Sequence, residues 1–295
     1  MNSKVHTKNY NLIHDLGLLV KFKLSLMVVL CSLLVYIIAA AGRWDWLIFS
    51  LLFVGGMFVT FGANILNEVL ERDYDKLMTR TMARPLADGR MSVSAAVLLS
   101  GLFCVLGIVA LSAIHPLAAT LGMLSFILYA FVYTPLKRFS TLAIPVGAIP
   151  GALPALIASV AAQGHLSLES LNLFAIQYLW QFPHFWAIAW LGHSDYTKAG
   201  FKLIKDIDGA PDPKFGLYAS IYSLSTLLIF IPTALVFNYS ILTIIGVVSL
   251  VLVYALFGLK LYKNNDRISA RNLMFFSFVY LPLVLFFFVI QNYLI

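Results

Sequence analysis

Long stretches of apolar residues, separated by short groups of charged residues, run through the whole chain. A helix needs about 20 apolar residues to cross the hydrocarbon core of a bilayer. By that measure the pattern predicts an all-α, polytopic membrane protein, a bundle of about nine transmembrane helices. The predicted spans cover residues 20–41, 46–66, 93–113, 116–136, 142–163, 170–192, 216–236, 239–261 and 271–292.

The composition supports this interpretation. Hydrophobic residues make up 61% of the 295 residues and charged residues only 11%, whereas ordinary soluble domains are about half apolar and a quarter charged. A soluble enzyme is therefore excluded. Because the pattern is continuous, we expect a single transmembrane domain over residues 1–295, with residues 1–19 as an N-terminal segment before the first span.

The basic residues predict the orientation in the membrane, since cytoplasmic loops carry the excess of Lys and Arg. Of the twenty Lys and Arg residues, all except Arg43 lie near the N-terminus or in loops that follow even-numbered spans. We therefore expect a cytoplasmic N-terminus and a C-terminus outside. No targeting signal is recognisable in residues 1–19, which favours the cell inner (plasma) membrane. Topology and anionic membrane lipid explain the net charge of +7, so no nucleic-acid partner is expected.

Nine of the thirteen acidic residues lie in two loops on this predicted cytoplasmic side. In the first loop Asn67, Glu71 and Asp75 recur every four residues, which places their side chains in one column on a helix that continues out of the second span. Such a column repels itself unless a cation lies beside it. Mg²⁺ prefers oxygen ligands and commonly binds one or two carboxylates together with substrate phosphates. The spacing therefore predicts a magnesium site.

Basic residues continue the same spacing. Arg72, Lys76, Arg80 and Arg84 predict a second column beside the acidic one. Arginine offers paired donors to phosphate oxygens while a metal neutralises the remaining charge, so the combination is typical of a diphosphate site. The alternative is a solvated helix end held by ion pairs between residues four apart, such as Glu68–Arg72.

Three motifs carry a family resemblance. They are Asn67-x-x-x-Glu71-x-x-x-Asp75 with Arg80-Thr81-x-x-Arg84-Pro85-Leu86, the segment 133–138, and the segment 180–186 followed by 195–200. The first resembles the signature of the UbiA-type intramembrane prenyltransferases, and the others resemble the branch of that family whose prenyl acceptor is a heme. The resemblance covers nearly the whole chain.

Two positions depart from the wider family. Glu71 stands where the first Asp of the leading motif is usual, which keeps the charge but lengthens the side chain. The second acidic motif of the aromatic prenyltransferases is absent, and Asp195 is the clear carboxylate left in that region. The heme branch normally lacks this motif, so the departure indicates a different acceptor.

The resemblance implies a transferase that moves a farnesyl group from farnesyl diphosphate to a vinyl group of heme b (protoheme IX), with Mg²⁺ as cofactor. The product would be heme o, made for terminal oxidases and passed on to a heme a synthase or an oxidase. A related enzyme that acts on a quinone precursor is the first alternative. A transporter is the second, but ionisable residues near mid-bilayer and inverted halves, which transporters carry, are not visible here.

The resemblance also implies roles for particular residues. His184, in an apolar span, is either a heme contact or a hydrogen-bonded structural residue, since an unpartnered polar group is costly there. The expected catalytic and metal-binding residues are Asn67, Glu71, Asp75 and Asp195. The expected diphosphate-binding residues are Arg80, Arg84, Lys137, Arg138 and Lys198, and the expected heme-binding residues are His184 and Trp186.

Overall fold

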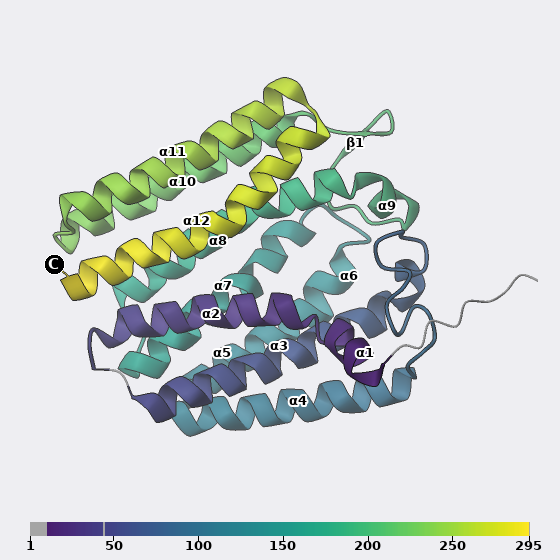
Figure 1. Cartoon of the computed structure of the whole chain (residues 1–295), viewed down its shortest axis with the longest axis horizontal. Coiled ribbons are helices and arrows are strands. Elements are labelled where there is room, and N and C mark those ends of the chain that lie inside the picture. The colour runs from purple at the N-terminus through teal and green to yellow at the C-terminus, as the bar shows by residue number, and fades with distance from the viewer. Residues whose placement is uncertain (1–10, 44, 295) are drawn as a thin grey trace, which may run out of the picture.

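The computed structural model describes residues 11–43 and 45–294, and shows a bundle of long helices (Figure 1). The first ten residues of the predicted N-terminal segment lie outside the described residues. In chain order the elements are α1 (Leu12–Leu19), α2 (Phe22–Ala40), α3 (Trp46–Asp75), α4 (Val93–Ile114), α5 (Pro116–Ile127), the π-helix η1 (Leu128–Tyr133), α6 (Thr134–Leu136), α7 (Ala143–Gln163), α8 (Leu168–Leu191), α9 (His193–Lys198), β1 (Asp206–Ile207), β2 (Ala210–Pro211), α10 (Lys214–Val236), α11 (Ile241–Asn264) and α12 (Arg267–Leu294).

The predicted spans match these helices. Within the described residues, eight helical segments are long and apolar enough to cross a membrane. The remaining predicted span, 170–192, corresponds to α8, which has 24 residues but is less apolar because it contains polar residues such as Gln177, Gln181 and His184. The prediction of an all-α, multi-pass bundle of about nine helices is confirmed.

Helix α3 extends beyond the apolar part of its sequence. Asp45 caps its first turn by accepting hydrogen bonds from the backbone N–H groups of Leu47 and Ile48, and the helix runs for 30 residues to Asp75. The predicted continuation of the second span is therefore confirmed. The predicted second basic column is wrong, because α3 ends before Arg80 and Arg84, which lie in the turns between α3 and α4.

The fourth span changes its helical geometry near its end. Residues Leu128–Tyr133 form a π-helix between α5 and α6. A π-helical turn contains an extra residue, which shifts the side chains that follow it, and such turns are frequent at functional sites. Here it delivers Tyr133, Thr134 and Lys137 to the charged end of the bundle.

Helices α3 and α4 pack closely because small residues face each other. A Cβ atom on Gly107 would lie 2.7 Å from the backbone nitrogen of Val59, so no larger side chain fits at that crossing. Ser100 of α4 also donates a hydrogen bond of 2.7 Å to the carbonyl of Gly62. The second half of the bundle consists of α8, α10, α11 and α12, which lie side by side (Figure 1).

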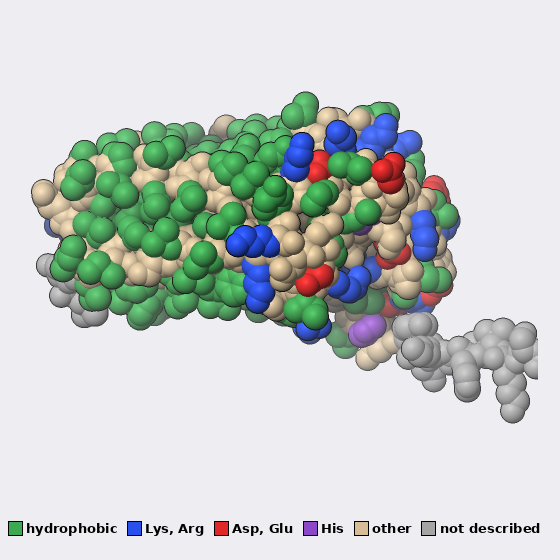
Figure 2. All heavy atoms as spheres, turned by 90° about the horizontal axis from the view of Figure 1, so that it is seen from above, with side chains coloured by type: hydrophobic (Ala, Val, Ile, Leu, Met, Phe, Trp, Pro, Cys, Tyr) green, Lys and Arg blue, Asp and Glu red, His purple; other side chains and the backbone are tan. Residues whose placement is uncertain are grey.

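Charged side chains gather at one end of the bundle. Figure 2 shows Lys, Arg, Asp and Glu at that end and hydrophobic side chains over the remainder of the visible face. Helix α1 lies at the charged end, whereas α12 ends at the opposite one (Figure 1). The segments that carry the residues predicted to bind diphosphate lie at this end (Figure 1).

Candidate active site

The last turns of α3 bury a row of polar side chains. The side chains of this row recur three or four positions apart, so they share the helix face that points into the bundle. Each is at most 5% exposed. Buried carboxylates are costly unless cations or hydrogen bonds compensate them, so the row has to be matched by partners from elsewhere in the chain. Its members are Asn64, Asn67, Glu68, Glu71 and Asp75.

Basic side chains from two other segments supply the compensation. Lys137 Nζ lies 2.6 Å from Glu71 Oε1, and Arg84 Nη1 lies 2.8 Å from Asp75 Oδ2. The same guanidinium places its Nε 3.6 Å from Glu68 Oε1. Three acids and two cations thus form one buried charged cluster.

Asn67 links this cluster to α6 and to the turn between α1 and α2. Its Oδ1 accepts a hydrogen bond of 2.5 Å from Lys21 Nζ, and its Nδ2 donates one of 3.0 Å to Thr134 Oγ1. Lys21 lies between α1 and α2 and has a left-handed backbone with φ of 48°, a conformation that non-glycine residues adopt rarely. The chain is therefore held in an unfavourable turn that directs a lysine toward Asn67.

The donor set fits a hard divalent cation. Both carboxylate oxygens of Glu68 and Oδ1 of Asp75 are buried without a hydrogen-bond partner among the described residues. Carboxylate and amide oxygens are the ligands that Mg²⁺ prefers, and it usually takes only one or two carboxylates, with water and phosphate oxygens as the remaining ligands. Within the described part of the chain, no three His, Cys, Asp or Glu side chains converge as a preassembled metal site. The arrangement therefore fits a cation that arrives with a phosphate ligand.

Asp195 is joined to the segment between α3 and α4. Its carboxylate accepts hydrogen bonds from Thr79 Oγ1 at 3.2 Å and from the backbone nitrogen of Arg80 at 3.3 Å. Burial acts to raise the pKa of Asp195, but these hydrogen bonds outweigh it and hold the pKa below its usual value. Arg80 in turn donates from Nη2 to the Tyr196 hydroxyl at 3.1 Å. Asp195 thus fixes Arg80, and its hydrogen bonds among described residues are with this segment and not with the acids of α3.

The other predicted diphosphate ligands lie further out. Arg138 is exposed, and its guanidinium carbon lies 4.5 Å from the centre of the Tyr74 ring, a cation–π contact. Lys198 is exposed at the end of α9. The structure therefore brings Arg84 and Lys137 together inside the cluster and leaves Arg80, Arg138 and Lys198 at its solvent side.

The two predicted heme contacts lie on different faces of α8. His184 Nδ1 is 2.6 Å from Ser277 Oγ of α12, and its ring stacks on Trp180 with 5.2 Å between ring centres. The hydrogen bond that His184 forms among the described residues uses Nδ1 and leaves Nε2 without a partner there. Trp186 packs against Phe215 and other aromatic rings of α10. The two side chains therefore contact different helices, His184 α12 and Trp186 α10.

Two residues at this site, Glu68 of the cluster and Lys21 beside Asn67, are missing from the residues predicted from the sequence. Glu68 precedes Asp75 by two helical turns, so the spacing alone placed it on the same face. Lys21 carried no such signal, because its approach to Asn67 depends on the turn between α1 and α2.

The interpretation as surface ion pairs holds for only part of the segment. Asp73 pairs with Arg72 and with Lys76 on the exposed side of α3. Glu68, however, is paired with Arg84 and not with Arg72. A solvated helix end therefore explains the outer face of α3, and not the buried one.

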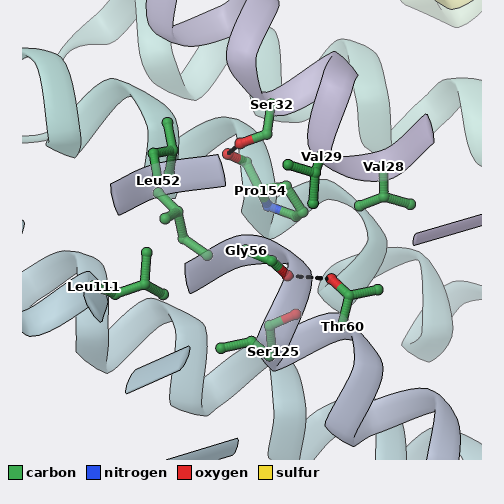
Figure 3. A pocket seen from close by; sticks show the side chains of 11 residues that line it. Val28, Val29, Ser32, Leu52, Gly56, Thr60, Leu111, Ser125 and Pro154 are labelled. Atoms are coloured by element: carbon green, nitrogen blue, oxygen red, sulfur yellow. Dashed lines mark hydrogen bonds between the residues drawn. The ribbon is translucent and has the colours of Figure 1, made fainter. Parts of the chain in front are cut away.

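A small apolar pocket of about 40 Å³ lies elsewhere in the same half of the bundle, between α2, α3 and α7 (Figure 3). Its hydroxyl groups are satisfied internally: Ser32 donates to the Pro154 carbonyl and Thr60 to the Gly56 carbonyl. Thr60 lies about 10 Å along α3 from Asn67, since each residue adds about 1.5 Å. The pocket is therefore a packing gap apart from the charged cluster.

Comparison with known proteins identifies relatives along nearly the full length. The model of the UbiA prenyltransferase family matches residues 27–279. A protoheme IX farnesyltransferase of Cytophaga hutchinsonii is 41% identical over 93% of this chain and 96% of its own length. One of Christiangramia forsetii is 36% identical over 99% of this chain and 98% of its own. The mitochondrial protoheme IX farnesyltransferase of Homo sapiens is 33% identical over 94% of this chain and 62% of its own.

Solved structures share the fold. The structure of a digeranylgeranylglyceryl phosphate synthase has a TM-score of 0.77 at 16% identity, covering 96% of this chain and 99% of that one. A UbiA homologue from Archaeoglobus fulgidus bound to DMAPP and Mg²⁺ has a TM-score of 0.64 at 15% identity, covering 93% and 99%. At such low identity these likenesses establish the helical architecture alone.

Proposed function

Because the chain belongs to the UbiA prenyltransferase family, we propose that it transfers a farnesyl group from farnesyl diphosphate to a vinyl group of heme b and so makes heme o. Relatives named protoheme IX farnesyltransferase that match nearly the full chain support this acceptor. The buried acid face of α3, with its unpartnered oxygens, carries the diphosphate half of the proposal.

A divalent cation, Mg²⁺, would be held by Asn67, Glu71 and Asp75, with the Glu68 carboxylate, which lacks a hydrogen-bond partner among the described residues, on the same helix face as a further oxygen donor. Asp195 would join these ligands by exchanging its hydrogen bonds with Thr79 and Arg80. When bound, it supplies Lewis-acid neutralisation of the charge that grows on the departing diphosphate. The Mg²⁺ and DMAPP bound to the Archaeoglobus fulgidus homologue support a cation of this kind.

The basic residues act on the same leaving group. Arg84 and Lys137, already inside the cluster, would donate hydrogen bonds to diphosphate oxygens in a site that excludes most water, where such contacts stabilise charge most strongly. The remaining three would receive the diphosphate at the solvent side; they are Arg80, Arg138 and Lys198.

Bond breaking separates diphosphate from an allylic cation, and both electrons of the carbon–oxygen bond leave with the diphosphate. Aromatic faces beside the cluster would stabilise the cation; Tyr133 is one candidate, with Lys137 Nζ 4.5 Å from its ring centre. The vinyl π electrons then form the new carbon–carbon bond. Water adds to the resulting porphyrin-side cation and loses a proton, which leaves the hydroxyl group of the product.

For the heme half, we propose His184 and Trp186 as contacts on α8. The Nε2 atom of His184 supports this role, because the described residues leave it without a hydrogen-bond partner while Ser277 holds Nδ1. Imidazole is a common iron ligand when one ring nitrogen is fixed in this way.

The wider setting follows from the same proposal. Residues 1–295 would form one prenyltransferase domain in the inner (plasma) membrane, with the charged end and the N-terminus in the cytoplasm. Heme o would pass to a heme a synthase or a terminal oxidase.

Mass analysis of the reaction products tests the choice of acceptor. The purified protein would be incubated with farnesyl diphosphate and Mg²⁺, and with either heme b or an aromatic quinone precursor. We expect a hydroxyfarnesylated heme, which EDTA abolishes. Unchanged heme beside a prenylated quinone precursor would refute the acceptor, and no reaction with either would refute a prenyltransferase altogether.

A further inference from the structure

Helix α1 is tied to the segment that carries Arg84 by a nearly buried ion pair. Arg90 donates from Nε to Asp15 Oδ2 at 3.0 Å and from Nη2 to Asp15 Oδ1 at 2.9 Å. The two side chains are only 15% and 7% exposed. Two parallel hydrogen bonds between a guanidinium and a carboxylate fix orientation as well as distance. This pair therefore restrains α1 relative to the segment that carries Arg90, which an exposed ion pair would not do.

The same guanidinium reaches the backbone next to the diphosphate cluster. Arg90 Nη2 also donates to the carbonyl of Ala83 at 2.9 Å, and Nη1 is paired with Asp88. Ala83 immediately precedes Arg84, whose side chain is bonded to Asp75 and paired with Glu68. A continuous path of polar contacts therefore runs from Asp15 through Arg90 to the backbone that positions Arg84.

Apolar packing also holds α1 against the segment between α3 and α4. Leu19 and Val20, at the end of α1, are buried in one cluster with Leu86 of the segment between α3 and α4. Asn11 caps the start of α1 by accepting from the backbone nitrogen of Ile13 at 3.1 Å. The cap stabilises the first turn of α1, and the packing of Leu19 and Val20 on Leu86 holds the end of the helix against the segment that carries Arg84.

We propose that Asp15 and Arg90 are positioning residues for the prenyl diphosphate: their ion pair holds the Ala83–Arg84 backbone so that Arg84 is preorganised toward the leaving group. The inference rests on the proposed function, because it assumes that Arg84 binds diphosphate. Neither residue would touch the substrate. Without the ion pair, Arg84 would have more conformational entropy to lose when it binds the diphosphate. The affinity would fall, because preorganised donors pay a smaller entropic cost on binding than mobile ones.

The test measures equilibrium binding of two probes to the full-length protein in Mg²⁺, a non-hydrolysable thiolo analogue of farnesyl diphosphate and heme b. We expect Asp15→Asn to lower the affinity for the diphosphate analogue about tenfold, the equivalent of one charge-assisted hydrogen bond, and to leave heme affinity unchanged. Hydrogen exchange of the backbone at residues 83–90 should become faster. The matched control is Asp73→Asn, which removes two exposed ion pairs, with Arg72 and with Lys76, and should change neither affinity.

A second variant guards against loss of folding. Arg90→Lys keeps the charge but loses the forked contact to Asp15 and the contact to the Ala83 carbonyl, so its affinity for the analogue should fall at least as far as that of Asp15→Asn. Wild-type affinity in Asp15→Asn, or equal losses for both probes, would overturn the inference. If the wild-type protein binds the analogue but leaves heme unmodified, the acceptor assignment fails separately; if it binds no diphosphate, the proposed function and this inference fall together.

Discussion

The pair formed by Lys137 and Glu71 offers a quantitative test of the charged cluster. The two side chains are 11% and 7% exposed, and their charged atoms are 2.6 Å apart. Removing one partner of a buried ion pair costs about 3–5 kcal/mol, because the other charge stays buried without compensation. Lys137→Met should therefore lower the free energy of unfolding by about that amount.

Neutralising both partners removes the uncompensated charge. A buried pair replaced by uncharged groups often costs little, so Lys137→Met combined with Glu71→Gln should be more stable than Lys137→Met alone. Contacting residues show coupling energies of about 0.5–3 kcal/mol. Because each single variant should lose about 3–5 kcal/mol and the double variant little, we expect a coupling energy at or above the top of that range. The coupling between the two residues should be favourable because both charges are buried, and this expectation does not depend on whether the variants remain active.

Tryptophan fluorescence can follow unfolding of the detergent-solubilised protein, since the chain contains five Trp residues. The matched control is Lys76→Met with Asp73→Asn, a pair at 2.9 Å whose side chains are 50% and 62% exposed. Exposed pairs contribute about 0–1 kcal/mol, so its coupling should be small. A coupling energy for Lys137 and Glu71 no larger than that of the control would refute the buried cluster.

Further predictions concern other parts of the site. Asn67→Ala should abolish transfer at saturating Mg²⁺ while leaving the protein folded, as product mass and thermal unfolding would show; near-normal turnover would remove Asn67 from the metal site. His184→Ala should weaken heme binding more than farnesyl diphosphate binding in direct titrations, whereas equal weakening would indicate disruption of α8. The hydrogen bond from Arg90 holds the pKa of Asp15 below its usual value. The ion pair therefore stabilises the fold fully above the usual pKa of an aspartate, about 4, and this stabilisation is lost as the pH falls through the lowered pKa. The unfolding temperatures of wild type and Asp15→Asn should converge in that acidic range; a constant difference would contradict this.

The apolar pattern predicted the helices well, because each span has to be apolar along its length whatever its neighbours are. The four-residue spacing of Asn67, Glu71 and Asp75 predicted the extension of α3 for a similarly local reason. Polar side chains that recur at the helical period after an apolar span indicate that the helix continues beyond that span. The π-helix at Leu128–Tyr133 was not predictable, since its residues are apolar in either helical form.

The partners of the acids were harder to predict. Lys137 lies 66 positions from Glu71 in the sequence, and Lys21 lies 46 positions from Asn67. Such contacts depend on how the helices pack. The basic column failed because the helix ended at Asp75, which turned the segment toward α9 and brought Arg84 back onto the buried face of α3.

The separation of His184 from Trp186 follows from simple geometry. Residues two positions apart on a helix point about 200° apart around its axis. The structure accordingly directs His184 toward α12 and Trp186 toward α10. Sequence alone could therefore have shown that the two residues contact different surroundings.

The most direct test of the account follows a labelled farnesyl group. Wild-type protein and Asp75→Ala would each be incubated with labelled farnesyl diphosphate, heme b and Mg²⁺, and the extracted porphyrin would be analysed for label. We expect labelled porphyrin from the wild type and none from a folded Asp75→Ala. Equal labelling by both proteins, or unlabelled porphyrin from the wild type, would contradict it.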